Sequence, residues 1–157
     1  MAKDCTGTVT SDETLKIVLH NGKKSMEIIN STSGELEWGF AVAQGTVTCG
    51  LSGKKETFAA NLFGINQVPD RVATVGQVIL NGNGNLSGSF TQSEEGTISS
   101  YTVTGSYTEK ADCTGTVTVT LPNALQAHFN SVRVNSGKEL LVIATDPGQS
   151  FNGTLQK

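Results

Sequence analysis

The sequence predicts an all-β protein: an antiparallel closed β-barrel of about eight strands, with an additional N-terminal half-repeat of about four strands. First, turn-forming groups such as Asn21-Gly22 and Asp146-Pro147-Gly148 interrupt the 157-residue chain at short intervals, and such residues supply the backbone conformations of tight turns. Second, the segments between them alternate apolar and polar residues, as half-buried strands do. No long segment has the 3.6-residue period of a helix. A closed barrel is favoured because so many strands in an open sheet would leave edges unpaired.

The expected strands follow from the turn signals and the alternation between them. The signals are, in chain order, Asn21-Gly22, Ser33-Gly34, Asn81-Gly82-Asn83-Gly84, Glu95-Gly96, Ser136-Gly137, Asp146-Pro147-Gly148 and Asn152-Gly153. The strands are expected at residues 5–10, 15–20, 25–31, 36–43, 57–63, 72–80, 86–92, 98–108, 114–121, 128–134, 139–145 and 150–156.

Alternation is clearest in segment 98–108, where Tyr101, Val103 and Tyr107 share one face and hydroxyl side chains occupy the other. Segment 114–121 repeats this pattern with valines opposite threonines. Apolar side chains on one face of a strand point to the core. The residues expected to face it are Tyr101, Val103, Tyr107, Val117 and Val119.

An internal repeat divides the chain unevenly. The heptapeptide Asp-Cys-Thr-Gly-Thr-Val-Thr occurs at residues 4–10 and again at 112–118, and the similarity extends over 4–44 and 112–157. The segment 45–111 occurs once. We therefore expect two parts: an N-terminal half-repeat at 1–44, packed on or completing the barrel, and a β-barrel unit at 45–157.

Composition excludes several classes of protein. The net charge of −3 and the few lysines and arginines argue against nucleic acid as a partner. No run of apolar residues is long enough to predict a membrane-spanning helix. No nucleotide-binding loop, nucleophile elbow or zinc-ligand spacing occurs, so no cofactor or metal is expected. No apolar signal core follows Met1: an exported or periplasmic location is expected if a signal peptide was removed, and a cytoplasmic one if Met1 is native.

One segment suggests a binding site. In the first copy of the repeat the aligned positions are leucine and isoleucine, whereas the second copy has Phe129, Ser131 and Arg133. If this face points into the barrel, Arg133 is a buried cation that must be paired or used, and a bound carboxylate would suit it. Tyr101 and Tyr107 could add hydroxyl groups to the same cavity. The alternatives are that the Arg133 face meets water and that the tyrosines only pack in the core.

The run from Cys49 to Lys157 resembles a family of small exported bacterial β-barrel proteins. The resemblance rests on the motifs at Val75-Gly76, 82–88, 105–107, 112–116, 137–140 and 145–148. It implies a small closed antiparallel barrel, similar to lipocalin-like or allene-oxide-cyclase-like barrels, but no definite activity. It also implies a disulfide between Cys49 and Cys113, with Cys5 free or in an intermolecular bond.

Three functions remain open from the sequence. The first is a barrel that holds a small apolar or weakly acidic ligand without covalent chemistry, since barrels of about eight strands have room for one small ligand. The second is a self-assembling surface or filament protein that uses the half-repeat for strand addition. The third is a cofactor-free cyclase or isomerase that shapes its substrate. The expected partner is accordingly a small molecule or the protein itself.

Overall fold

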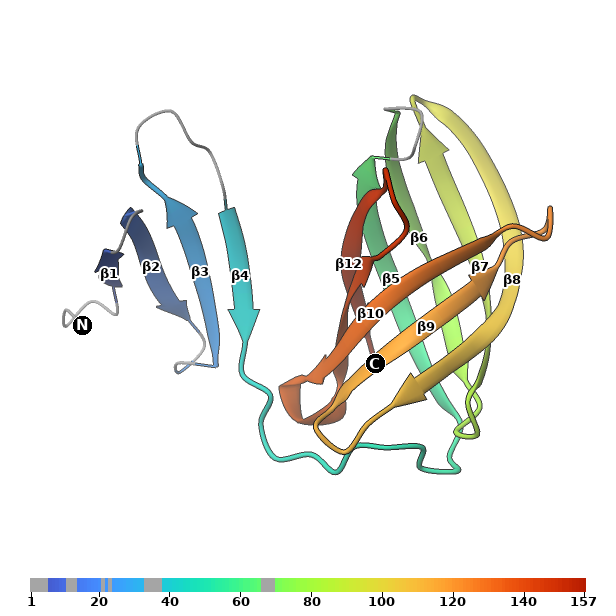
Figure 1. Cartoon of the computed structure of the whole chain (residues 1–157), viewed down its shortest axis with the longest axis horizontal. Coiled ribbons are helices and arrows are strands. Elements are labelled where there is room, and N and C mark those ends of the chain that lie inside the picture. The colour runs from blue at the N-terminus through green and yellow to red at the C-terminus, as the bar shows by residue number, and fades with distance from the viewer. Residues whose placement is uncertain (1–5, 11–13, 21, 23, 33–37, 66–69) are drawn as a thin grey trace. The chain divides into compact units, whose positions relative to one another are not determined.

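The computed structural model describes residues 6–10, 14–20, 22, 24–32, 38–65 and 70–157. The chain falls into two units, Met1–Gly45 and Thr46–Lys157, which are drawn together in Figure 1. Among the described residues the regular structure consists mainly of β-strands, with a short 3-10 turn, η2 (Asn135–Gly137), between two of them. No helix in these ranges is long and apolar enough to cross a membrane.

The second unit is a closed antiparallel barrel, which confirms the predicted fold class. Its strands pair in the order β10-β11-β12-β5-β6-β7-β8-β9, and β9 pairs with β10 to close the ring (Figure 1). The strands are β5 (Glu56–Ile65), β6 (Arg71–Leu80), β7 (Asn85–Glu94), β8 (Thr97–Glu109), β9 (Thr114–Thr120), β10 (Gln126–Val134), β11 (Glu139–Ala144) and β12 (Ser150–Gln156).

The first unit contains a separate four-stranded antiparallel sheet in the order β1-β2-β3-β4. The additional half-repeat of about four strands is therefore present as its own sheet, and the barrel closes without any of its strands. How the half-repeat packs stays a prediction. The strands are β1 (Thr6–Thr10), β2 (Thr14–His20), β3 (Ser25–Asn30) and β4 (Trp38–Val42).

The sequence repeat is also a repeat of strand register. β1–β4 pair with one another as β9–β12 do, residue for residue, so each position in the N-terminal sheet has an equivalent in the barrel. The equivalent pairs that matter below are Gly7 and Gly115, Val9 and Val117, Leu15 and Phe129, Ile17 and Ser131, Leu19 and Arg133, Met26 and Leu140, Ile28 and Val142, Gly39 and Gly153, and Ala41 and Leu155.

The predicted alternation holds inside the barrel. Val103 and Tyr107 are buried, and Tyr101, Val117 and Val119 pack against the same core. On the outer face, Thr108 and Thr116 are exposed and join their hydroxyl groups at 2.8 Å across β8 and β9. The period-two pattern thus places the apolar side chains where an eight-stranded barrel needs them to fill its interior.

Two glycines allow neighbouring strands to approach closely where the two halves of the barrel meet. A Cβ atom at Gly153 on β12 would overlap the carbonyl oxygen of Asn61 and lie 2.8 Å from Leu62 Cα, both on β5. A Cβ atom at Gly115 on β9 would overlap the carbonyl oxygen of Thr108 on β8. Neither position accepts a side chain without moving the backbone of the next strand.

The disulfide implied by the family resemblance is confirmed. Cys49 and Cys113 are bonded, with their Cα atoms 5.0 Å apart and a separation of 64 positions in sequence. The bond joins the segment before β5 to the start of β9, so it links the two halves of the barrel. Cys5 lies outside the described residues.

Candidate functional site

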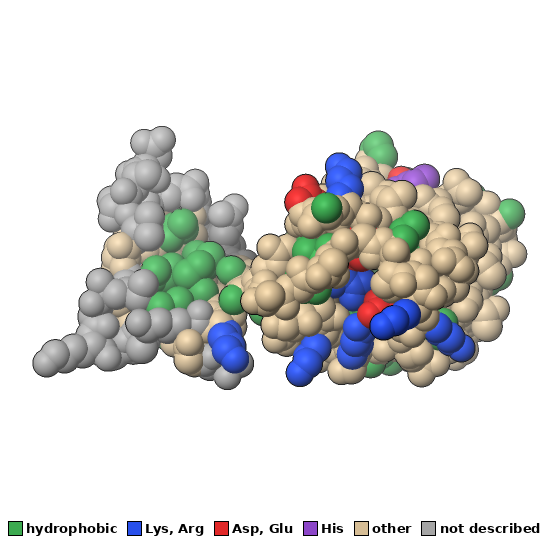
Figure 2. Space-filling model, turned by 90° about the horizontal axis from the view of Figure 1, so that it is seen from below, with side chains coloured by type: hydrophobic (Ala, Val, Ile, Leu, Met, Phe, Trp, Pro, Cys, Tyr) green, Lys and Arg blue, Asp and Glu red, His purple; other side chains and the backbone are tan. Residues whose placement is uncertain are grey.

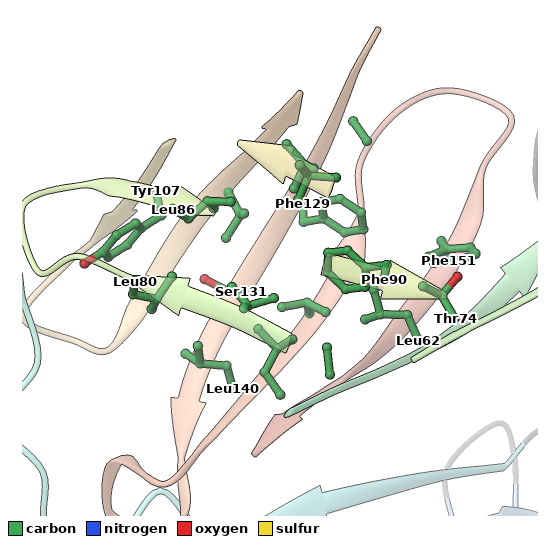
Figure 3. A pocket seen from close by; sticks show the side chains of 18 of the residues that line it. Leu62, Thr74, Leu80, Leu86, Phe90, Tyr107, Phe129, Ser131, Leu140 and Phe151 are labelled. Carbon is green, nitrogen blue, oxygen red and sulfur yellow. The ribbon is translucent and has the colours of Figure 1, made fainter. Parts of the chain in front are cut away.

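A cavity of about 270 Å³ lies inside the barrel. Its lining comes from strands of both halves and is mainly aliphatic and aromatic (Figure 3). Figure 3 shows Phe90 and Phe151 toward one end and Tyr107, Leu80 and Leu86 toward the other. The two ends differ in burial and in chemistry, and this difference defines what the cavity can hold.

The end formed by the start of β5 and the end of β8 is closed by a buried ion network. Arg133 Nε donates to Glu109 Oε1, and Arg133 Nη2 donates to Glu56 Oε2 at 3.0 Å. Arg133 Nη1 also donates to the carbonyl oxygen of Gly137 at 3.2 Å. The guanidinium carbon lies 5.7 Å from the ring centre of Phe58, which is fully buried.

Charges around this network hold Arg133 protonated. Burial alone would lower the pKa of Arg133, but hydrogen bonds and charge from Glu109 and Glu56 raise it above its usual value. Glu109 Oε2 in turn accepts a hydrogen bond from Gly50 N at 3.1 Å, and Lys157 Nζ donates to Glu56 Oε1. Figure 2, which views the barrel from this end, shows basic and acidic side chains gathered there. The network therefore ties β5, β8 and β10 together.

The opposite end of the cavity is more open. Several of its lining residues, including Leu62, Phe129 and Phe151, are only partly buried, whereas Leu80, Leu86 and Leu140 near the ion network are buried. Phe90 and Tyr101 stack here with ring centres 5.9 Å apart. The described part of the lining therefore has an apolar, aromatic mouth at the end where β9 leads into β10.

A polar group lies among the apolar side chains near this mouth. Thr74 on β6 is 2% exposed, and its Oγ1 has no hydrogen-bond partner among the described residues. The nearby Tyr101 hydroxyl instead donates to Gln92 Oε1 at 3.0 Å. Burial raises the pKa of Tyr101; its contact with Thr74 opposes this, and the charge of Glu94 adds to it. A buried hydroxyl without a partner is costly, so Thr74 is an available hydrogen-bonding position for a bound molecule.

The charged groups at the mouth are mostly acidic. Asp70, Glu94, Glu95 and Asp146 lie in the turns at this end or at the strand ends beside them, and Arg71 is the one lysine or arginine among the described residues of these turns and strand ends. The pKa of Asp146 is lowered, chiefly because its carboxylate accepts a hydrogen bond from the backbone N–H of His128. The mouth therefore disfavours anions.

All five residues predicted for a binding site line this cavity: Tyr101, Tyr107, Phe129, Ser131 and Arg133. Their polar groups differ in availability. The Tyr107 hydroxyl accepts a hydrogen bond from Gly82 N at 3.0 Å, and Arg133 binds two carboxylates. The Ser131 hydroxyl makes no such contact with the described residues, and Phe129 offers only its ring. Binding of a ligand by these five residues stays a prediction.

Two lining residues, Thr74 and Gln92, carry no distinguishing signal in the sequence. A threonine in a strand is ordinary, because threonine favours strands whichever face it occupies. The feature of the sequence that could identify Thr74 as a site residue is its position on the same inward face as Val72, Val78 and Leu80. A single polar residue on an otherwise apolar face is the pattern that could have drawn attention to it.

Within the described ranges, no group of three histidine, cysteine or acidic side chains is placed to hold a metal ion. Comparison with protein-family models and with curated proteins found no match to this chain. The cavity geometry is therefore the basis for the function considered next.

Proposed function

We propose that the barrel binds a small, uncharged, mainly apolar molecule carrying one hydrogen-bonding group, and holds it without covalent chemistry. Ligand sites are typically apolar cavities with a few well-placed polar groups. Here the apolar walls supply affinity through burial, and the polar positions near the mouth fix the orientation of the ligand.

The observation that carries this proposal is the unpaired hydroxyl of Thr74. Its Oγ1 is buried beside the cavity and has no partner among the described residues. A ligand hydroxyl or carbonyl that reached Thr74 would remove the cost of leaving this group unpaired. Tyr101 and Gln92 provide further hydrogen-bonding capacity at the same end of the cavity.

A neutral ligand is favoured over an acidic one. The cation that could pair with a ligand carboxylate is Arg133, and both Glu109 and Glu56 already bind its guanidinium. A carboxylate ligand would also pass the acidic residues at the mouth. Displacing a buried carboxylate from its cation leaves that charge unpaired, which is strongly unfavourable.

The cavity volume limits the size of the ligand. Drug-sized ligands occupy sites of about 300–1,000 Å³, and this cavity of about 270 Å³ falls just below that range. One or two fused aromatic rings, or a short branched hydrocarbon, fit this volume. The Cys49–Cys113 disulfide further favours action in an oxidising compartment outside the cytoplasm.

The test uses two fluorescent probes of similar shape, 2-naphthol and naphthalene. Both should bind the full chain, and 2-naphthol should bind more tightly because only it carries a hydroxyl. Thr74→Val should weaken 2-naphthol binding about tenfold, the effect of one hydrogen bond of about 1.4 kcal/mol, and leave naphthalene binding unchanged or stronger. The matched control is Thr102→Val, since Thr102 is exposed on the outer face of β8.

Three results would count against the proposal. They are no saturable binding of either probe, equal loss of both probes in Thr74→Val, and equal effects of Thr74→Val and Thr102→Val. Recovery of 2-naphthol unchanged by mass spectrometry after incubation would support holding rather than conversion. Conversion to an isomer would favour the cyclase alternative.

A further inference from the structure

The N-terminal sheet has an apolar face that corresponds to the interior of the barrel. The equivalences of register place Leu15, Ile17 and Leu19 of β2 and Met26 and Ile28 of β3 on this face. None of these five side chains is fully buried, and Figure 2 shows hydrophobic side chains in view on this unit. In the barrel the equivalent face of β9–β12 is covered by β5–β8.

The two edges of the N-terminal sheet also lack their counterparts. In the barrel β12 pairs with β5 and β9 pairs with β8. The equivalent strands β4 and β1 are the edges of their sheet, and no described strand pairs with their outer sides. The barrel of the same chain is closed, so it has no free edge to offer them.

A glycine on β4 marks the place of a missing neighbour. Gly153 on β12 is required because β5 passes close to it. Its equivalent on β4 is Gly39, and nothing lies within 4 Å of a Cβ atom built there. The first copy thus retains, at the edge of an open sheet, the residue that allows close approach of another strand. Gly7 on β1 corresponds in the same way to Gly115 on β9.

The side chain equivalent to Arg133 identifies the partner. Arg133 forms ion pairs with Glu56 of β5 and Glu109 of β8, whereas the equivalent residue in the N-terminal sheet is Leu19. A β5–β8 unit docked on this sheet would bring two carboxylates against a leucine, without the cation that pairs them. The face of a second N-terminal sheet is aliphatic except for Asn30 at one end, and brings no buried charge.

We propose that the N-terminal sheet is half of a second eight-stranded barrel, completed by the N-terminal sheet of another copy of this chain. β4 of each copy pairs with β1 of the other, so a two-fold axis runs along the new barrel. The strand directions are compatible with this pairing. Strand direction alternates around an antiparallel barrel, so β1 of the second copy, as the fifth strand, runs in the same direction as β1 of the first. It is therefore antiparallel to β4 of the first copy, its neighbour. This arrangement pairs all four edges and covers both apolar faces.

The first test is the mass of the full chain in solution, measured by light scattering over a range of concentrations. A dimer is expected. Gly39→Val should convert it to a monomer, because the added side chain fills the space reserved for the partner strand. The matched control is Phe40→Val, which should remain dimeric because Phe40 lies next to Gly39 on the opposite face.

A second variant separates the two candidate partners. Leu19→Arg places an arginine at the position equivalent to Arg133. In a barrel of two N-terminal sheets it buries two arginines without carboxylates, and the dimer should dissociate. If the partner were the β5–β8 segment of another copy, the same change would supply the missing cation for Glu56 and Glu109. Tighter association of Leu19→Arg would therefore overturn the proposal.

Hydrogen exchange on the unmodified chain keeps the test decisive if a variant fails to fold. Amides of β1 and β4 should be protected at high concentration and exchange faster on dilution, while the barrel strands stay unchanged. Three other results would overturn the proposal: a monomer at all concentrations, a dimer unaffected by Gly39→Val, and open-ended filaments in place of a closed dimer.

Discussion

Replacing Thr74 by valine is expected to make the free protein more stable while weakening its binding of a hydroxylated ligand. The substitution exchanges a hydroxyl for a methyl group of similar volume, on a strand where valine is favoured. In the free protein Thr74 Oγ1 is buried and has no hydrogen-bond partner among the described residues. Removing it therefore removes an unfavourable group and leaves the packing in place.

The magnitude follows from the cost of burying a polar group. A buried hydroxyl without a partner costs about 1–3 kcal/mol in mutational data. A weaker interaction with the nearby Tyr101 hydroxyl, which does not have hydrogen-bond geometry, offsets part of this cost. We therefore expect a gain at the lower end of the range, about 1 kcal/mol in the free energy of unfolding. For a domain of this size that corresponds to a rise in Tm of about 4 °C.

The assay is urea denaturation followed by circular dichroism, without ligand and with saturating 2-naphthol. Thr74→Val should raise the midpoint without ligand and leave the slope unchanged. With 2-naphthol the wild-type protein should gain more stability than the variant, because stabilisation by a ligand grows with affinity. A loss of more than about 1 kcal/mol in the free variant would refute the reasoning, since it would show a productive hydrogen bond from Thr74 in the free protein.

Three other predictions concern the closed end, the disulfide and Tyr101. Arg133→Met should lower the free energy of unfolding by about 3–5 kcal/mol, because the buried Glu109 loses its cation and Glu56 keeps only Lys157. Lys157→Met should cost less than about 1 kcal/mol because Lys157 is partly exposed. Equal costs in urea denaturation would contradict the assignment of Arg133 as the centre of the network. Reducing Cys49–Cys113, which closes a loop of 64 residues, should cost about 4 kcal/mol if the bond acts mainly on the entropy of the unfolded chain, and an unchanged midpoint in reductant would argue against this. Burial raises the pKa of the Tyr101 hydroxyl above 10.0, its value in the unfolded chain, so its contribution to stability should be full below pH 10 and be lost as the pH rises through the folded-state pKa. Tyr101→Phe should flatten this alkaline loss of stability. An identical loss in both proteins would show that other groups cause it.

The strands could be predicted from the sequence because their signals are local. Alternation along β8 identified Tyr101, Val103 and Tyr107 as inward residues, and each of them faces the barrel interior. The turns follow glycine and asparagine for the same reason, since positive backbone angles at positions such as Gly82 and Gly96 are what these turns require. Closure of the ring followed from the number of strands.

The pairing of the site residues is not local and could not be predicted in this way. Arg133 meets Glu109, which is 24 residues away, and Glu56, which is 77 residues away. The sequence indicates that a buried arginine needs a partner, but the partner depends on barrel register. The alignment of the repeats shows that Leu19 stands where the second copy has Arg133. The consequence of this difference can be inferred only when the carboxylates of Glu56 and Glu109 are located in the structure.

The measurement that tests the central claim most directly is an amide and methyl NMR titration of the full chain with 2-naphthol. A barrel that holds this probe in its cavity should show saturable shifts at inward positions near the mouth, including Thr74, Tyr101 and Phe129, with outward residues such as Thr102 and Thr116 unchanged. Shifts confined to the outer face, or no saturable shift at Thr74, would contradict the account.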